Sequence, residues 1–254
     1  MKKIMISLVA VIFATSSISI SAYGQETDTI TDSRDSHIYK TVKIGDQWWM
    51  AENLKFWADK NSPYYKGVSY FYKGVNEYYY RYGRLYSWEV AKEVCPDGWH
   101  LPSMDEWYSL INNFGDLYDA NDKNPIKKES SKKSKEIKKL RKEINAALRE
   151  DGKGGFDVLY GGYRDPNPPT TTSYNANLNF LENLAENLAD HPGYYFGVEN
   201  CAFFWSSNDN VEKGMFKKQK ANGFQFLKSK WSKPFYPIPI KKLNGCSVRC
   251  VKDK

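Results

Sequence analysis

The chain has 254 residues, of which 41% are hydrophobic, 16% aromatic and 26% charged, with a formal net charge of +7 at pH 7. This balance excludes extensive disorder, because enough apolar surface is present to offset the entropy that the chain loses on folding. Nineteen tyrosines and eight tryptophans favour a β-rich domain, since ring faces pack well on a pleated sheet while their polar edges reach partners.

The first 24 residues have the pattern of a secretory signal peptide. Two lysines follow the initial methionine, an apolar run covers residues 4–14, and small residues precede residue 24. That run is shorter than the roughly 20 residues that cross a bilayer, and no later run approaches this length, so we expect no transmembrane anchor. We expect cleavage near residues 22–24 and a secreted protein, located in the periplasm, on the outer cell surface or outside the cell.

Residues 25–36 are polar, which favours a leader or linker, and we expect a single domain over residues 37–254. Apolar and polar residues alternate over 38–44, and Gly45-Asp46 then precede a second run over 47–50, which predicts a β-hairpin. Residues 64–88 contain eleven aromatic side chains separated by glycines. There we expect short strands and aromatic loops.

A helix is predicted over residues 104–113. Ser103 can accept a hydrogen bond from the first helical amides while Glu106 bonds back to it, the pattern of a capping box. The apolar face of this helix would consist of Trp107, Leu110, Ile111 and Phe114. Further strands are expected over residues 203–207, 223–227 and 246–251.

Two segments have the pattern of helical insertions. Residues 121–153 contain twelve Lys or Arg against six acids, and apolar residues recur there at helical spacing: Ile137, Leu140, Ile144, Ala147 and Leu148. We interpret this segment as a basic helix docked by its apolar stripe, with contact to an anionic surface as the alternative. Residues 165–192 open on a proline- and threonine-rich stretch and continue as a second amphipathic helix.

The four cysteines, Cys95, Cys201, Cys246 and Cys250, allow two disulfides and three pairings in an exported protein. On a strand, Cys246 and Cys250 would share one face and could not easily bond each other. We therefore favour Cys95 with Cys250 and Cys201 with Cys246. Zinc is the weaker alternative, because neither a Cys-x-x-Cys pair nor paired histidines accompany these residues.

Four ordered blocks resemble a known family. They read YKTVKIGDQ and WMAENL over residues 39–54, YGRLYSW over 82–88, CPDGWHLPS over 95–103, and SVRCVKD over 247–253. Together they resemble the Fibrobacter succinogenes major paralogous domain family, the FISUMP domain. The resemblance implies an exported protein of Bacteroidetes-like or Fibrobacter-like bacteria and an α+β, C-type-lectin-like fold related to formylglycine-generating enzymes. Such a fold has small twisted antiparallel sheets, flanking helices and a long irregular loop region. It implies no settled biochemical activity.

The sequence gives little support for an enzyme. Only three histidines are present, and Gly-x-Ser-x-Gly, His-Glu-x-x-His and phosphate-loop motifs are missing from the sequence. We interpret His100 as a packed structural histidine, and Arg164 and Arg249 as buried donors to backbone or carboxylate groups. Because formylglycine-generating enzymes use a thiol pair, an oxidase with Cys201 and Cys246 as its reactive thiols is the alternative.

Carbohydrate recognition would use aromatic faces and planar polar side chains. The aromatic candidates are Trp57, Tyr70, Tyr72, Tyr78, Tyr79 and Tyr80, and the polar candidates are Asn208, Asp209 and Asn210. The competing interpretation is core packing for the rings and a simple turn for the polar run. We expect no metal site and no cofactor. Calcium is the one ion left open, although its six to eight oxygen ligands cannot be assembled from the sequence.

The sequence thus predicts an exported, non-enzymatic module that binds a glycan or a surface protein through aromatic-rich loops. Export argues against nucleic acid as a partner, and the basic segment 121–153 is the candidate contact for anionic surfaces. Besides the thiol oxidase, a structural subunit of a surface appendage is the remaining alternative.

Overall fold

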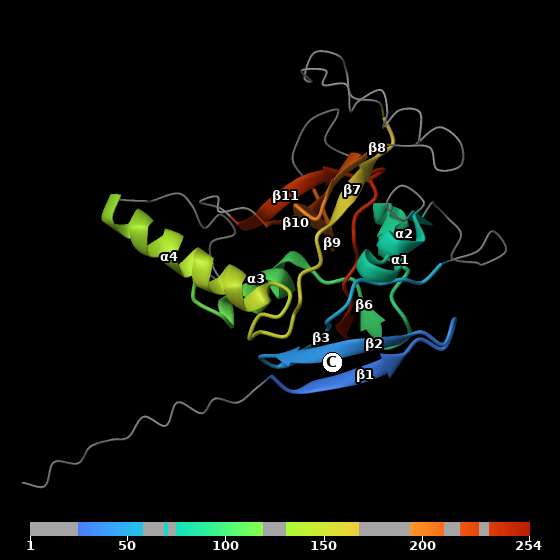
Figure 1. The fold of residues 1–254 in the computed structure, drawn as a ribbon, viewed down its shortest axis with the longest axis horizontal. Helices are drawn as coiled ribbons and strands as arrows, with labels where there is room; N and C mark the ends of the chain where they lie inside the picture. Colours follow the sequence, from blue (N-terminus) through green and yellow to red (C-terminus); the bar gives the residue numbers. More distant parts are fainter. Residues whose placement is uncertain are drawn as a thin grey trace, which may run out of the picture.

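The computed structural model describes residues 25–57, 69–70, 75–118, 131–167, 194–210, 219–228 and 234–254. These residues form two five-stranded sheets, one two-stranded sheet and four helices. Figure 1 shows the strands β1–β3 below the strands β7–β11, with α3 and α4 on one side of the molecule and α1 and α2 on the other. The chain is therefore α+β, as predicted.

The first sheet joins the two ends of the described chain. Its order is β1-β2-β3-β12-β6, with the bounds β1 Thr27–Thr31, β2 Ile38–Ile44, β3 Gln47–Met50, β6 Trp99–His100 and β12 Val251–Lys252. The predicted hairpin is confirmed, with Ile44 opposite Gln47. Its turn needs Gly45, because φ there is +61° and a Cβ would lie 2.6 Å from the Asn113 side chain.

Strand β1 lies within the segment that we expected to be a linker, so ordered structure begins before His37. The strand pairs antiparallel with β2, from Thr27 opposite Val42 to Thr31 opposite Ile38. Most of its side chains are exposed. Because an edge strand needs backbone pairing rather than an apolar face, its polar composition hid it in the sequence.

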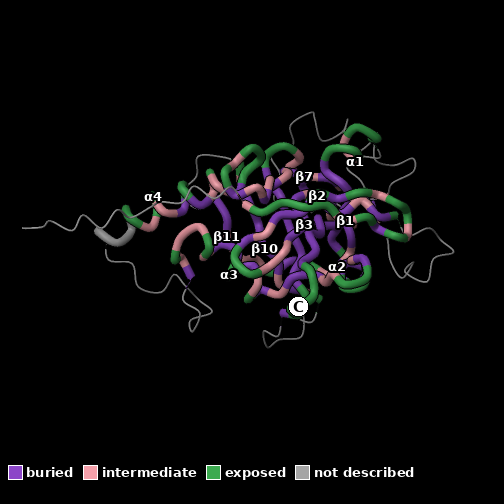
Figure 2. Tube along the Cα trace, turned by 90° about the horizontal axis from the view of Figure 1, so that it is seen from below, coloured by how far each residue is buried: buried purple, intermediate pink, exposed green. Residues whose placement is uncertain are grey.

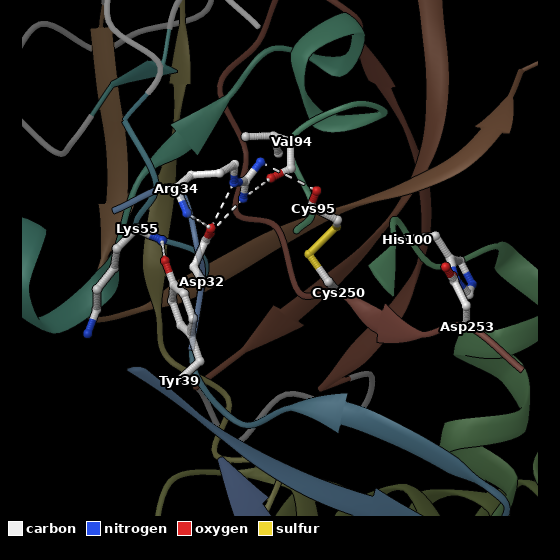
Figure 3. The surroundings of a disulfide bond; sticks show 9 residues. All are labelled: Asp32, Arg34, Tyr39, Lys55, Val94, Cys95, His100, Cys250 and Asp253. Atoms are coloured by element: carbon white, nitrogen blue, oxygen red, sulfur yellow. Dashed lines mark hydrogen bonds and ion pairs between the residues drawn. A yellow bond between two sulfur atoms is a disulfide. The ribbon is translucent and has the colours of Figure 1, made fainter. Parts of the chain in front are cut away.

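The turn after β1 is fastened to the body of the protein. Asp32 is fully buried and forms an ion pair with Arg34, whose Nη2 lies 2.6 Å from Asp32 Oδ2. Arg34 also donates to the carbonyl oxygens of Val94 and Cys95 (Figure 3). The N-terminal strand is thereby tied to the segment that carries the first cysteine.

The second sheet has the order β11-β10-β9-β7-β8, with the bounds β7 Gly161–Asp165, β8 Tyr194–Val198, β9 Cys201–Asp209, β10 Lys220–Leu227 and β11 Phe235–Lys241. Most neighbours in it are antiparallel, and β7 and β9 are parallel at the pair Gly162 and Ala202. A separate two-stranded sheet consists of β4 (Ser69–Tyr70) and β5 (Leu85–Tyr86).

Helix α3 (Met104–Asn112) connects the two large sheets. The predicted capping box is present, because Ser103 accepts from the Glu106 amide and Glu106 accepts from the Ser103 amide. Trp107 is fully buried, and its ring lies 5.2 Å from that of Trp49 in the first sheet and 5.6 Å from that of Phe224 in the second. Some of the many aromatic residues of the chain therefore pack in this core.

Helix α4 (Ser131–Leu148) occupies much of the predicted basic insertion, and its apolar stripe docks as predicted. Ile144 and Leu148 are fully buried in the main core, and Leu140 packs against it. Figure 2 shows the buried residues concentrated where the sheets meet, while the N-terminal end of α4 extends away from them. The predicted helix of the second insertion lies outside the described residues.

Two short helices complete the described elements, α1 (Asn76–Tyr82) and α2 (Trp88–Ala91). Among the helices that the structure describes, none combines the length and the apolar character that a membrane span requires.

Candidate functional site

The rings of Trp57 and Tyr79 lie against the Arg84 guanidinium, and the ring of Tyr80 lies beside that of Tyr79. We call this group, Trp57, Tyr79, Tyr80 and Arg84, the aromatic surface. Trp57 is 62% exposed and Tyr80 is 71% exposed, which is unusual for rings of this size. The Arg84 guanidinium carbon lies 5.6 Å from the ring of Trp57 and 5.6 Å from that of Tyr79. The rings of Tyr79 and Tyr80 are 5.3 Å apart.

Arg84 supports the aromatic surface, because its guanidinium contacts two of the three rings. It is buried, and burial lowers the pKa of its guanidinium. Its Nε donates to Ser69 Oγ over 3.0 Å, and its backbone amide donates to the Leu54 carbonyl over 3.0 Å. Arg84 therefore links the segment that leads to Trp57 with the end of helix α1.

The segment that precedes Trp57 is fixed by three tyrosine hydroxyls. Tyr39 accepts from the Lys55 amide over 3.0 Å, Tyr86 donates to the Phe56 carbonyl over 2.7 Å, and Tyr79 donates to the Lys55 carbonyl over 3.5 Å. Burial raises the pKa of Tyr39, Tyr79 and Tyr86, so all three hydroxyls keep their protons at neutral pH. The backbone under the exposed Trp57 ring is thus ordered before any ligand arrives.

The structure separates the other predicted aromatic residues from this surface. Tyr70 is buried, and the Arg164 guanidinium carbon lies 3.6 Å from its ring centre. Tyr78 stacks on Tyr82 with ring centres 6.1 Å apart. Both therefore pack within the chain, which is the competing interpretation that the sequence left open. Tyr72 lies outside the described residues.

The polar run Asn208, Asp209 and Asn210 serves the scaffold. Residues 208 and 209 end strand β9 instead of forming a separate turn. Asn208 Oδ1 accepts from the Met104 amide at the start of α3 over 2.7 Å, Asp209 pairs with Lys242 over 2.8 Å, and Asn210 is buried. Within the described ranges, no group of three or more His, Cys, Asp or Glu side chains is arranged to hold a metal ion.

One of the two predicted disulfides is confirmed. Cys95 and Cys250 are bonded across 155 residues, with their Cα atoms 5.9 Å apart (Figure 3). The prediction of a bond between Cys201 and Cys246 is wrong, because both are free and buried. Cys201 Sγ instead donates to the Gly197 carbonyl over 3.4 Å in the β8–β9 turn, where a Cβ on Gly197 would collide with that sulfur.

Burial raises the pKa of the Cys201 thiol to about 11 and that of Cys246 well above its usual value. A thiol acts as a nucleophile only as its thiolate, so both cysteines are poorly suited to attack a substrate or a disulfide at neutral pH. The arrangement gives the oxidase alternative no support.

A cluster that the sequence did not predict surrounds His100. Its Nδ1 lies 2.6 Å from Asp253 Oδ1, its Nε2 lies 3.0 Å from Glu106 Oε1, and its ring is 40% exposed (Figure 3 shows the Asp253 contact). Burial opposes charging of the ring, but the bonds to both carboxylates outweigh it and raise the pKa of His100. Hydrogen bonds to Ser103 and His100 likewise outweigh burial and lower the pKa of Glu106.

Replacing His100 by Gln is expected to have a pH-dependent cost. A raised folded pKa means that the ion pairs stabilise the fold fully below the unfolded value of about 6.5 and lose this effect as the pH rises through the folded value. For a partly exposed cluster the gain is about 0.5 kcal/mol. The difference in free energy of unfolding between wild type and His100→Gln, measured by urea unfolding, should therefore be larger at pH 5.5 than at pH 9. Equal separation at both pH values would show that His100 does not act through its charge.

Comparisons with known proteins give one result. A family model described as the Fibrobacter succinogenes major domain matches residues 42–252, which is most of the chain. The matched range contains the confirmed disulfide, α3 with its capping box, and both large sheets except the edge strand β1 and the first four residues of β2. No curated protein and no solved structure matches the chain. The chain belongs to the Fibrobacter succinogenes major domain family.

Proposed function

We propose that this chain is an exported, non-enzymatic binding module of the bacterial cell surface or envelope, with a C-type-lectin-like arrangement, which recognises a glycan or a protein through its aromatic surface. The observation that carries the proposal is the exposure of Trp57 and Tyr80, at 62% and 71%, on a backbone that is fixed from beneath.

A partner that covered Trp57 and Tyr80 would remove a large apolar area from water. Large aromatic side chains bury 150–250 Å² each when they pack, so leaving two of them exposed forgoes a large hydrophobic gain unless a partner covers them. Ring faces stack on the C–H faces of sugars, and they also anchor protein interfaces. Because Arg84 and the tyrosine hydroxyls already order the backbone of the aromatic surface, the chain should lose little conformational entropy when a ligand binds.

The proposal is tested on a glycan array and in a pull-down from envelope extracts, with the oxidised wild-type chain and the variants Trp57→Ala and Tyr80→Ala. We expect each variant to lose about tenfold or more in affinity, since a ring at the centre of an interface contributes about 2 kcal/mol. Leu243→Ala is the matched control, because Leu243 is 68% exposed and lies outside the aromatic surface.

Two outcomes would overturn this function. Equal binding by wild type and both ring variants would place the ligand elsewhere. Turnover of a thiol or peptide substrate by a chain that retains no ligand would favour an enzyme. Thiol titration of the native chain adds a direct check on the oxidase alternative, because buried Cys201 and Cys246 should react only after unfolding.

A further inference from the structure

We propose that helix α4 carries a second binding site, for a linear acidic polysaccharide, along a row of four lysines. We call this row, Lys135, Lys138, Lys139 and Lys142, the lysine stripe. All four side chains are exposed. The proposal goes beyond the aromatic surface and does not depend on it.

The docking of α4 determines which way the lysine stripe faces. With 3.6 residues per turn, positions 135, 138, 139 and 142 fall on one side of a helix, and positions 137, 141, 144 and 148 fall on the opposite side. Ile144, Leu148 and Arg141 are buried, which assigns that opposite side to the core. The lysine stripe is therefore turned directly away from the body of the protein, on the helix that extends outward in Figure 1.

The positive charge of the stripe is largely uncompensated. Among the described residues, the only ion pair of the stripe joins Lys139 to Glu143 at 3.8 Å, and both side chains are more than half exposed. Water and salt screen such a pair strongly. The segment 121–153 as a whole contains twelve basic against six acidic residues. A field of this sign attracts an anionic polymer.

The geometry favours an extended polymer over a bilayer. An amphipathic helix gains most of its affinity for a membrane interface by inserting its apolar face, and the apolar face of α4 is already buried against the core. From residue 135 to residue 142 the stripe covers about 10 Å along the helix axis. A linear chain that carries a carboxylate on each sugar can place several charges along that length at once.

The experiment uses polygalacturonate as the probe, with the oxidised full chain at low ionic strength. The test variant reverses Lys135, Lys138 and Lys142 to Glu, and the control variant reverses the exposed lysines Lys40, Lys252 and Lys254 to Glu. Both variants change the net charge equally. We expect the stripe variant to lose about tenfold or more in affinity and to flatten the salt dependence, and the control to lose less than about threefold.

A further variant and a second probe distinguish a specific site from attraction by net charge and from membrane binding. A triple change of the same stripe lysines to Gln removes charge without adding acid, and it should also weaken binding if the helix remains folded by circular dichroism. Equal losses in the stripe and control variants would show attraction by net charge alone and overturn the site. Undetectable binding of wild type to polygalacturonate, or tighter binding to phosphatidylglycerol vesicles, would overturn the assignment to an acidic polysaccharide.

Discussion

Replacing Cys95 and Cys250 together by Ala is expected to lower the free energy of unfolding by about 4–5 kcal/mol. The bond closes a loop of 155 residues, and a cross-link across so long a loop removes much of the entropy of the unfolded chain. It also ties the residue before β12, which pairs with β3 and β6 in the first sheet, to the segment before β6. Urea unfolding of the purified oxidised chain, compared with the double variant, measures the difference.

The chain supplies a matched control for this loss in its other two cysteines. Cys201→Ala with Cys246→Ala removes the same number of sulfur atoms without breaking a covalent bond, so we expect a cost of about 1–2 kcal/mol from lost packing alone. Similar losses in the two double variants would contradict the assignment. Peptide mapping without reduction should show residues 95 and 250 linked.

The second large effect is expected at Arg249, for which Arg249→Met should cost about 3–5 kcal/mol. The side chain is fully buried and donates to four acceptors. Nε donates to Asn53 Oδ1 over 2.8 Å, and the terminal nitrogens donate to the carbonyls of Met50, Phe156 and Asp157. A methionine fills much of the space but leaves these acceptors without a donor.

Two further variants distinguish the effect of losing the hydrogen bonds of the guanidinium from the effect of losing a positive charge. Arg249→Lys keeps a cation but supplies a single nitrogen, so it should lose most of the same stability. Arg81→Met removes an arginine that is 54% exposed and paired with Glu150, and it should cost under about 0.5 kcal/mol. If Arg249→Met lowered the free energy of unfolding no more than Arg81→Met does, the proposed stabilisation by the buried hydrogen bonds of Arg249 would be contradicted.

Local signals predicted the elements that depend on nearby residues. The hairpin followed from alternation and Gly45, helix α3 from Ser103 and Glu106, and the docking of α4 from the spacing of Ile144 and Leu148. The structural role of Arg249 and the bond from Cys95 to Cys250 were also predicted correctly. The hairpin and the two helices depend on residues that are close together in the sequence. The disulfide was predicted from the rule that cysteines on one face of a strand do not easily bond each other.

What the sequence could not predict depends on which side chains the fold brings together. Strand β1 is polar because only its backbone is needed at a sheet edge. The contact of His100 with Asp253 joins residues 153 positions apart, and no periodicity reports it. Cys201 lies in the same buried cluster as Cys246, but its sulfur is held at the Gly197 turn.

The candidate site shows the same division. An excess of rings predicted aromatic-rich loops, but Tyr79 and Tyr80 lie on helix α1. The rings also differ in burial, since Tyr80 is exposed and Tyr70 is buried. That difference arises because Tyr70 pairs opposite Leu85 in the small sheet and lies against Arg164, whereas Tyr80 is on the solvent side of α1. Arg84, which supports the surface, was not predicted, since a buried arginine has no distinctive spacing in sequence.

The most direct test of a binding role for the aromatic surface is amide hydrogen exchange of the oxidised chain, with and without the strongest ligand from the glycan array. Binding at this surface predicts slower exchange over residues 54–57 and in helix α1, because a covering ligand shields the amides beside Trp57 and Tyr80. Slower exchange confined to segments outside these two, or an unchanged pattern with ligand bound, would contradict it.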